Sequence, residues 1–183
     1  MAEGEKTEPQ YFEGLSLHLN AQAVQIIRLE SVGLGRDPLR VVNAALKLRD
    51  VEEKEGDPYD AVWCVVDVDQ HATLEPACHH AKRNGLEIAV SSPCFEVWLL
   101  WHFQEHAGWI TSQSLSEKLK KFGFTDKNLP ESFPYAEYSK AKVRAERCAE
   151  IRQRHDPPNP SSSVSALVGV LAVASKRSRQ SHG

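Results

Sequence analysis

The segment AVWCVVDVDQH, residues 61–71, decides the fold class. Its first six residues, 61–66, are apolar and rich in valine, which is typical of a central parallel strand covered on both faces. Asp67 and Asp69 follow where this strand ends, and side chains two positions apart on a strand point the same way. They would stand about 6.5–7 Å apart along the backbone, within reach of one divalent cation or of two. Because ligands of open α/β sheets bind beyond the carboxyl ends of the strands, the DVD triplet predicts a metal site at this edge.

Strand-like and helix-like segments alternate on both sides of this strand. Their order through the first hundred residues favours a parallel sheet with right-handed crossovers. The patterns predict strands over 24–29, 61–66 and 86–90 and helices over 9–19, 39–54, 73–83 and 94–106, the last opened by Ser92-Pro93 as its cap. Beyond Trp109 the pattern is helical, with helices expected over 114–122, 138–154 and 163–174.

The expected fold class is therefore α/β, a parallel sheet flanked by helices, with a helical C-terminal extension. A chain of 183 residues suits one domain with such an appendage. We place the α/β domain at residues 1–110, the helical extension packed on it at 111–175, and a disordered tail at 176–183. Within 94–106 the apolar spacing is typical of a core stripe, formed by Phe95, Trp98, Trp101 and His102.

Composition narrows the classes of function. The net charge of −3 provides no overall cationic field, so nucleic acid would have to bind a local patch. The four cysteines form no CxxC pair and are interpreted as reduced thiols of a cytoplasmic protein. No apolar run approaches the ~20 residues that a membrane-spanning helix needs, so we expect no membrane partner. A zinc site at Cys78, His79 and His80 is disfavoured because their spacing fits no structural zinc pattern well.

A second acidic cluster lies in the first residues of the chain. Glu3 precedes Gly4, which lets the backbone approach a ligand closely, and Glu8 precedes Pro9 at a helix start, where the helix dipole favours negative charge. Glu5 is interpreted as an ordinary helix-start acid. A βα unit needs a strand before Glu3, and we expect this first strand to be missing or truncated. Carboxylates gathered at one sheet edge would repel one another without a cation.

Four motifs together resemble those of the RloB-like proteins, which are Toprim-type proteins found near bacterial restriction and abortive-infection genes. In chain order they are EGEKTEPQYF, YDAVWCVVDVDQH, SSPCFEVWLLWHF and NPSSSV, and the resemblance covers about residues 1–171. It implies a Toprim-like sheet in which an acid after the first strand and a later DxD bind Mg²⁺ or Mn²⁺ for phosphodiester cleavage. Carried over, Glu3, Asp67 and Asp69 match these acids. Glu8 is the nearest match to a second glutamate but stands one residue further along.

Further residues are candidates for the same site. His71 is either a general base or phosphate contact, or an exposed loop histidine. Glu96 either binds the metal, directly or through a ligand, or complements the dipole of its apolar helix. NPSSSV caps the final helix through one of its serines, and the resemblance makes Asn159 and Ser161 candidates to line the site. Three cations on one helix face either contact a nucleic-acid backbone or are merely solvated: Lys140, Arg144 and Arg147.

These observations lead to two hypotheses about function. The first is a metal-dependent nuclease that hydrolyses phosphodiester bonds of DNA or RNA in cytoplasmic anti-phage defence, with Mg²⁺ or Mn²⁺ as cofactor. An ATPase of the ABC or AAA type is a possible partner of such a defence system. The alternative is a non-catalytic protein that binds nucleic acid or regulates that ATPase.

Overall fold

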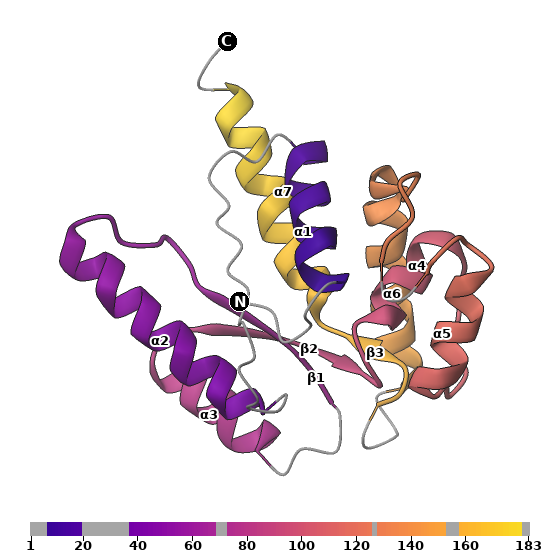
Figure 1. The fold of residues 1–183 in the computed structure, drawn as a ribbon, viewed down its shortest axis with the longest axis horizontal. Helices are drawn as coiled ribbons and strands as arrows, with labels where there is room; N and C mark the ends of the chain where they lie inside the picture. The colour runs from indigo at the N-terminus through magenta and orange to yellow at the C-terminus, as the bar shows by residue number, and fades with distance from the viewer. Residues whose placement is uncertain (1–6, 20–36, 69–72, 126–127, 153–157, 181–183) are drawn as a thin grey trace.

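The computed structural model describes residues 7–19, 37–68, 73–125, 128–152 and 158–180 (Figure 1). Helices and strands alternate from α2 to α4, and the elements after α4 are mainly helical, as the sequence predicted. In chain order the elements are α1 (Thr7–Leu19), α2 (Pro38–Glu55), β1 (Trp63–Asp67), α3 (Leu74–Arg83), β2 (Glu87–Ser92), α4 (Glu96–Phe103), α5 (Ser112–Lys120), a 3₁₀ turn (Tyr135–Glu137), α6 (Tyr138–Arg152), β3 (Ser161–Ser162) and α7 (Val164–Gln180).

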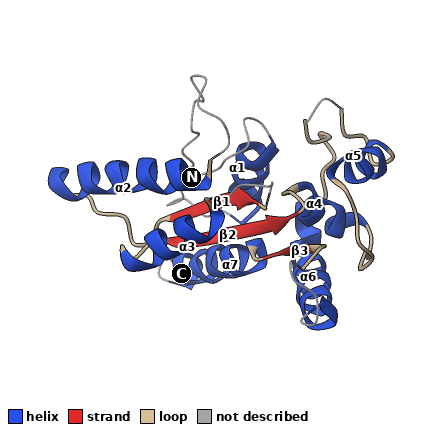
Figure 2. Cartoon of the chain, turned by 90° about the horizontal axis from the view of Figure 1, so that it is seen from below, coloured by secondary structure: helices blue, strands red, loops and turns tan. Residues whose placement is uncertain are grey.

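The described strands form one mixed sheet in the order β1-β2-β3. β1 and β2 are parallel, with Trp63 opposite Glu87 and Asp67 opposite Ser91, and α3 is the crossover between them. β3 is antiparallel to β2. In Figure 2, β1 and β2 run side by side toward α4. The protein is therefore a mixed α/β fold in which helices flank a small sheet.

Helices cover the two faces of the sheet, and the alternation of side chains along β1 divides the core between them. Cys64 and Val66 lie in a cluster with residues of α2 and α3. Val65 lies in a larger cluster with residues of α1, α4, α5, α6 and α7. Figure 1 shows α2 and α3 on one side of the strands and α1 with α7 on the other. Burial on both faces explains why this strand is apolar at every position from Cys64 to Val66.

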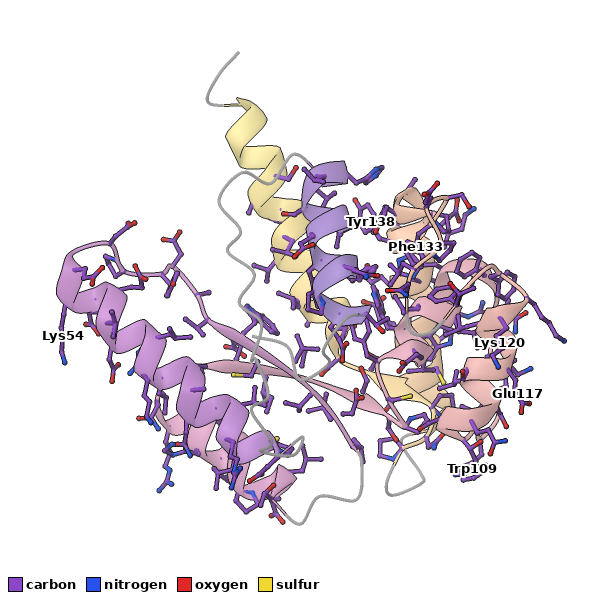
Figure 3. All side chains as sticks on the ribbon, viewed as in Figure 1. Lys54, Trp109, Glu117, Lys120, Phe133 and Tyr138 are labelled. Atoms are coloured by element: carbon purple, nitrogen blue, oxygen red, sulfur yellow. The ribbon has the colours of Figure 1, made fainter. Side chains whose placement is uncertain are left out.

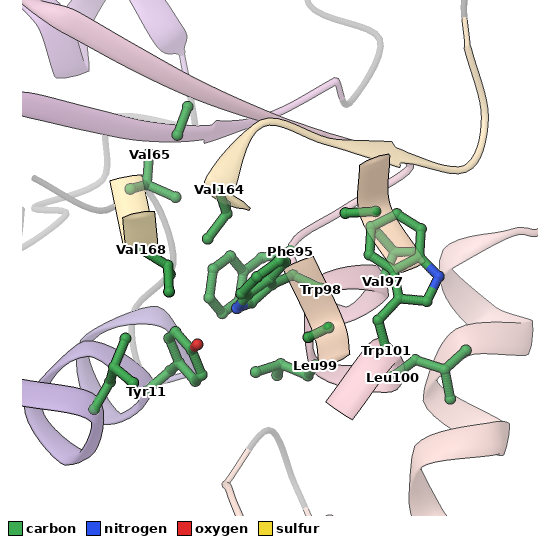
Figure 4. Packing of buried hydrophobic residues seen from close by; sticks show 14 of the residues in the cluster. Tyr11, Val65, Phe95, Val97, Trp98, Leu99, Leu100, Trp101, Val164 and Val168 are labelled. Carbon is green, nitrogen blue, oxygen red and sulfur yellow. The ribbon is translucent and has the colours of Figure 1, made fainter. Parts of the chain in front are cut away.

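The larger cluster is built on α4, most of whose side chains are buried. In Figure 4, Val65 of β1 and Val164 of α7 lie near Phe95 and Trp98. Phe133, in the connection between α5 and α6, joins this cluster between α1 and α4 (Figure 3). Burying each large apolar side chain contributes about 1.5–3 kcal/mol, so the aromatic stripe predicted for this helix dominates the core.

Caps encoded in the sequence set the ends of α2. The Asp37 carboxylate accepts a hydrogen bond from the Leu39 N–H at 3.1 Å, and Pro38 opens the helix. Gly56 ends it with a left-handed φ of 88°, a conformation that glycine adopts without strain. Asp37 also accepts a hydrogen bond from the Thr73 hydroxyl, just before α3. The starts of α2 and α3 are thus tied together.

Several sequence expectations need correction. Ser92 does not cap α4, because it is the last residue of β2 and pairs with Ser161; the helix spans only Glu96–Phe103. The two-residue β3 was not predicted. α7 continues to Gln180, so the first part of the expected disordered tail, residues 176–180, is helical. The predicted strand over 24–29 and the expectation of a missing first strand lie outside the described residues.

Candidate active site

Asp67 is the last residue of β1 and marks the carboxyl end of the parallel pair. The backbone pairing extends one residue beyond it, because the Val68 N–H donates to the Ser91 carbonyl at 2.8 Å. Side chains alternate along the strand, so the half-buried Asp67 projects from the same face as Val65. That face is the one covered by α1, α4 and α7.

Glu96 reaches the same neighbourhood from α4. Pro93 and Cys94 connect β2 to this helix, whose first residue is Glu96. Both carboxylates affect the pKa of the nearby Cys94 thiol. Burial raises its pKa, and the negative charges of Glu96 and Asp67 raise it further, against a lowering hydrogen bond with Ser112. Two carboxylates from separate elements, Asp67 of β1 and Glu96 of α4, are thus both close enough to the Cys94 thiol to affect its pKa.

Glu8 begins α1 on the face that packs against α4. It is only 6% exposed, and Tyr11 and Phe12 follow it at the three- and four-residue spacing that shares a helix face. Their rings both contact Phe95, at 5.7 and 5.8 Å between centroids, and Phe95 immediately precedes Glu96. The start of α1 thus lies on the same face of the sheet as Asp67.

Two serines are in register with Asp67 across the sheet, and the three residues form a row that crosses the described strands. Asp67 is opposite Ser91, and Ser91 is opposite Ser162 of β3. The Ser91 and Ser162 hydroxyl oxygens lie 2.8 Å apart. The sequence analysis singled out neither residue. An i, i+2 extension of the alternation from Ala89 would have placed Ser91 on this face, but no sequence signal revealed β3.

A family model described as RloB-like protein matches residues 1–171. The chain belongs to the RloB-like family. No curated protein and no solved structure matches it. The match includes Glu8, Asp67, Glu96 and Ser162, so the candidate site lies wholly within the RloB-like region, as do the four motifs that suggested the resemblance.

The final RloB-like motif, NPSSSV, acts partly as expected. The Ser162 hydroxyl accepts a hydrogen bond from the Val164 N–H at 3.3 Å, so a serine does cap α7. Asn159 instead binds the loop before α5. Its side-chain oxygen accepts from the Ile110 N–H at 3.1 Å, and its side-chain N–H donates to the Ile110 carbonyl at 3.0 Å. The Ser161 hydroxyl donates to the Pro158 carbonyl at 2.8 Å. The structure thus places Ser162 on the Asp67 row, and engages Asn159 and Ser161 elsewhere.

The three cations of α6 each have a partner within the protein. Arg144 donates to the Trp101 carbonyl in the last turn of α4. Lys140 pairs with Glu137 at 2.6 Å, and Arg147 with Glu105 at 3.6 Å. Their contact with nucleic acid stays a prediction, and phosphate would compete with these partners.

The carboxylates of this region are suitable ligands for a divalent cation. Carboxylate oxygens are the ligands that Mg²⁺ and Mn²⁺ prefer, so Asp67 and Glu96 fit such an ion chemically. No group of three or more His, Cys, Asp or Glu close enough to hold a metal occurs among the described residues, Cys78, His79 and His80 included. Three predicted site residues, Glu3, Asp69 and His71, lie outside the described part of the chain.

Among the described residues, no helix is long and apolar enough to cross a membrane.

Proposed function

We propose that this RloB-like protein is a metal-dependent nuclease that hydrolyses phosphodiester bonds of DNA or RNA. The observation that supports this most is the position of Asp67 at the carboxyl end of a parallel strand pair, with Glu96 at the start of the helix that follows the second strand. Ligand sites of α/β sheets occupy this edge. Carboxylates gathered at such an edge would repel one another, and a cation would relieve that repulsion.

Within this proposal, the carboxylates supply oxygen ligands. Asp67 and Glu96 hold the cation together with Glu3, Glu8 and Asp69. A bound Mg²⁺ or Mn²⁺ would neutralise charge on the scissile phosphate and lower the pKa of an attacking water. His71 either accepts the proton of that water or donates a hydrogen bond to phosphate. Lys140, Arg144 and Arg147 contact the nucleic-acid backbone.

We extend the proposal to a Toprim-like arrangement and to a cellular role. The β1–α3–β2 unit, with an acid at the end of its first strand, is compatible with the strand, acid and helix order that the motifs suggested. The four cysteines, Cys64, Cys78, Cys94 and Cys148, form no disulfide with one another, which suits a reducing cytoplasm. The role is anti-phage defence, with an ABC- or AAA-type ATPase as a partner.

The test is a cleavage assay with the full-length protein. DNA and RNA, including transfer RNA, are incubated with Mg²⁺, Mn²⁺ or a chelator. We expect metal-dependent cleavage by the wild type and a loss of at least about 100-fold in Asp67→Asn, because losing a ligand should exceed the 10- to 100-fold effect of losing its support. Glu96→Gln should show a loss in the same direction.

The matched control is Asp60→Asn, which removes an exposed carboxylate before the opposite end of β1. It should cleave like the wild type, and thermal melts should show that all variants fold. Absence of cleavage of every substrate with both metals would refute the nuclease. Nucleic-acid or ATPase binding by the same protein would then favour the non-catalytic alternative.

A further inference from the structure

The row Asp67–Ser91–Ser162 crosses all three described strands of the sheet. Side chains of residues paired across a sheet project from the same face and have β-carbons about 5 Å apart. The 2.8 Å distance between the Ser91 and Ser162 oxygens shows that these two do meet on that face. On β1, the next side chain of the row is the Asp67 carboxylate.

Ser91 is a fully buried hydroxyl, with an exposure of 0%. A buried hydroxyl is tolerated where its hydrogen bonds are satisfied. Ser162 accepts a hydrogen bond from the Val164 N–H at 3.3 Å, which leaves the Ser162 hydrogen available for the Ser91 oxygen. The Ser91 hydroxyl can then direct its own hydrogen toward the next side chain of the row, which is the Asp67 carboxylate.

We propose that Ser91, supported by Ser162, is a positioning residue that donates its hydroxyl hydrogen to the Asp67 carboxylate and fixes that carboxylate for cation binding. This inference rests on the proposed function and adds to it a role for β3. The start of α7, through the Val164 N–H, orients the pair of hydroxyls. Loss of such support for a metal ligand typically weakens metal binding about 10- to 100-fold.

A purely structural role for the serines makes a different prediction. If Ser162 only attached β3 to β2, any substitution that weakens this attachment would reduce Mn²⁺ affinity to a similar extent. Ser163 provides the comparison, because the Val90 N–H donates to its hydroxyl at 2.8 Å and this bond joins β3 to β2 away from the Asp67 row. Ser161→Ala provides a second control, since the Ser161 hydroxyl donates to Pro158 instead.

The experiment is calorimetric titration of Mn²⁺ into the full-length chain, with the thermal midpoint of each variant measured in parallel. We expect Ser91→Ala and Ser162→Ala to weaken Mn²⁺ binding about 10-fold or more. Ser162→Thr, which restores the hydroxyl, should recover most of the affinity. Ser163→Ala and Ser161→Ala should bind like the wild type, even where Ser163→Ala melts at a lower temperature.

Two results would overturn the inference alone. One is wild-type affinity in Ser91→Ala while Asp67→Asn loses binding. The other is an equal loss in Ser163→Ala and Ser162→Ala, which would assign the effect to the attachment of β3. If Ser91→Ala does not fold, the comparison of Ser162→Ala with Ser162→Thr decides. A wild type that binds no Mn²⁺ would overturn the metal-dependent nuclease and this inference together.

Discussion

The Tyr11 hydroxyl donates a hydrogen bond to His102 Nε2 at 3.3 Å, in the interior between α1 and α4. The direction follows from the other ring nitrogen. His102 Nδ1 lies 3.1 Å from the Trp98 carbonyl, and because a carbonyl only accepts, Nδ1 carries the hydrogen and Nε2 is the acceptor. A neutral histidine therefore links two helices that are far apart in the sequence.

This buried histidine predicts that stability falls in mild acid. Burial lowers the pKa of His102 from 6.5 to about 4, and the positive charge of Arg144 adds to the lowering. Between about pH 4 and pH 6.5, the unfolded chain binds a proton at His102 that the folded chain does not. The contribution of the neutral His102 to stability is therefore complete above about pH 6.5 and decreases as the pH falls toward 4. Denaturant unfolding at several pH values should show a loss of about 3 kcal/mol.

A matched pair of substitutions tests whether His102 causes this acid-dependent loss of stability. His102→Gln should flatten the dependence on pH between 4 and 6.5, whereas His79→Gln, at an exposed position on α3, should leave it unchanged. An unchanged acid-dependent loss in His102→Gln would assign the effect to other groups.

Gly14 of α1 should resist substitution. Replacing a helical glycine with alanine usually stabilises a protein by up to about 1 kcal/mol. Here a β-carbon at Gly14 would overlap the Tyr135 ring, which also contacts Tyr11 and Phe133. We expect Gly14→Ala to be destabilising by about 1–3 kcal/mol, as overpacking is. Tyr135→Leu in the same chain should recover part of the loss, and a stabilised Gly14→Ala would show that the ring moves aside easily.

Two cations of α6 should contribute unequally to stability. Arg144 is half-buried and donates to the Trp101 carbonyl, and a hydrogen bond from a charged donor contributes about 1.5–3 kcal/mol. Arg147 pairs with Glu105 at the surface, and such pairs contribute about 0–1 kcal/mol. Arg144→Met should therefore lower the free energy of unfolding measurably more than Arg147→Met; equal effects would contradict the assignment.

The same helix provides a test of nucleic-acid contact. If Lys140 and Arg147 bind phosphates, replacing both with glutamine should weaken binding to all sequences alike. The slope of log affinity against log salt concentration should also fall by about 1.4–1.8. Lys54→Gln, at the far end of α2, is the control (Figure 3). An unchanged slope would show that these cations are solvated and bind only Glu137 and Glu105.

Asn159 should prove structural. Asn159→Asp keeps an oxygen that could bind a cation but loses the N–H that donates to the Ile110 carbonyl. We expect it to destabilise the protein by about 1–3 kcal/mol while Mn²⁺ affinity of the folded protein stays the same. A changed affinity would return Asn159 to the site that its motif first suggested.

Local patterns were enough to predict the parts of the fold that a single segment determines. The apolar run before Asp67 predicted β1 and the place where it ends, because a strand buried on both faces has no polar positions. Glu96 was noticed because a carboxylate is unusual in an apolar helix. Both predictions depend only on neighbours in the sequence, and both carboxylates raise the pKa of the Cys94 thiol.

The parts that could not be predicted depend on long-range pairing. β3 has only two residues, too few for a period, so nothing indicated that NPSSSV joins the sheet. Which serine then faces Asp67 depends on register, and a shift of one residue exchanges Ser161 for Ser162. Asn159 binds Ile110 across 49 positions. Of the three cations, Arg144 bonds to α4 because of how the two helices pack, which the charge pattern does not encode.

The pairing of α1 with α7 joins the two ends of the described chain. The Ser175 hydroxyl donates to the Leu19 carbonyl, and α7 covers the face from which Asp67 projects. A nascent chain therefore cannot complete this core until α7 has left the ribosome. The face of the sheet that carries Asp67 is thus completed by an element that is synthesised after every proposed ligand of the site.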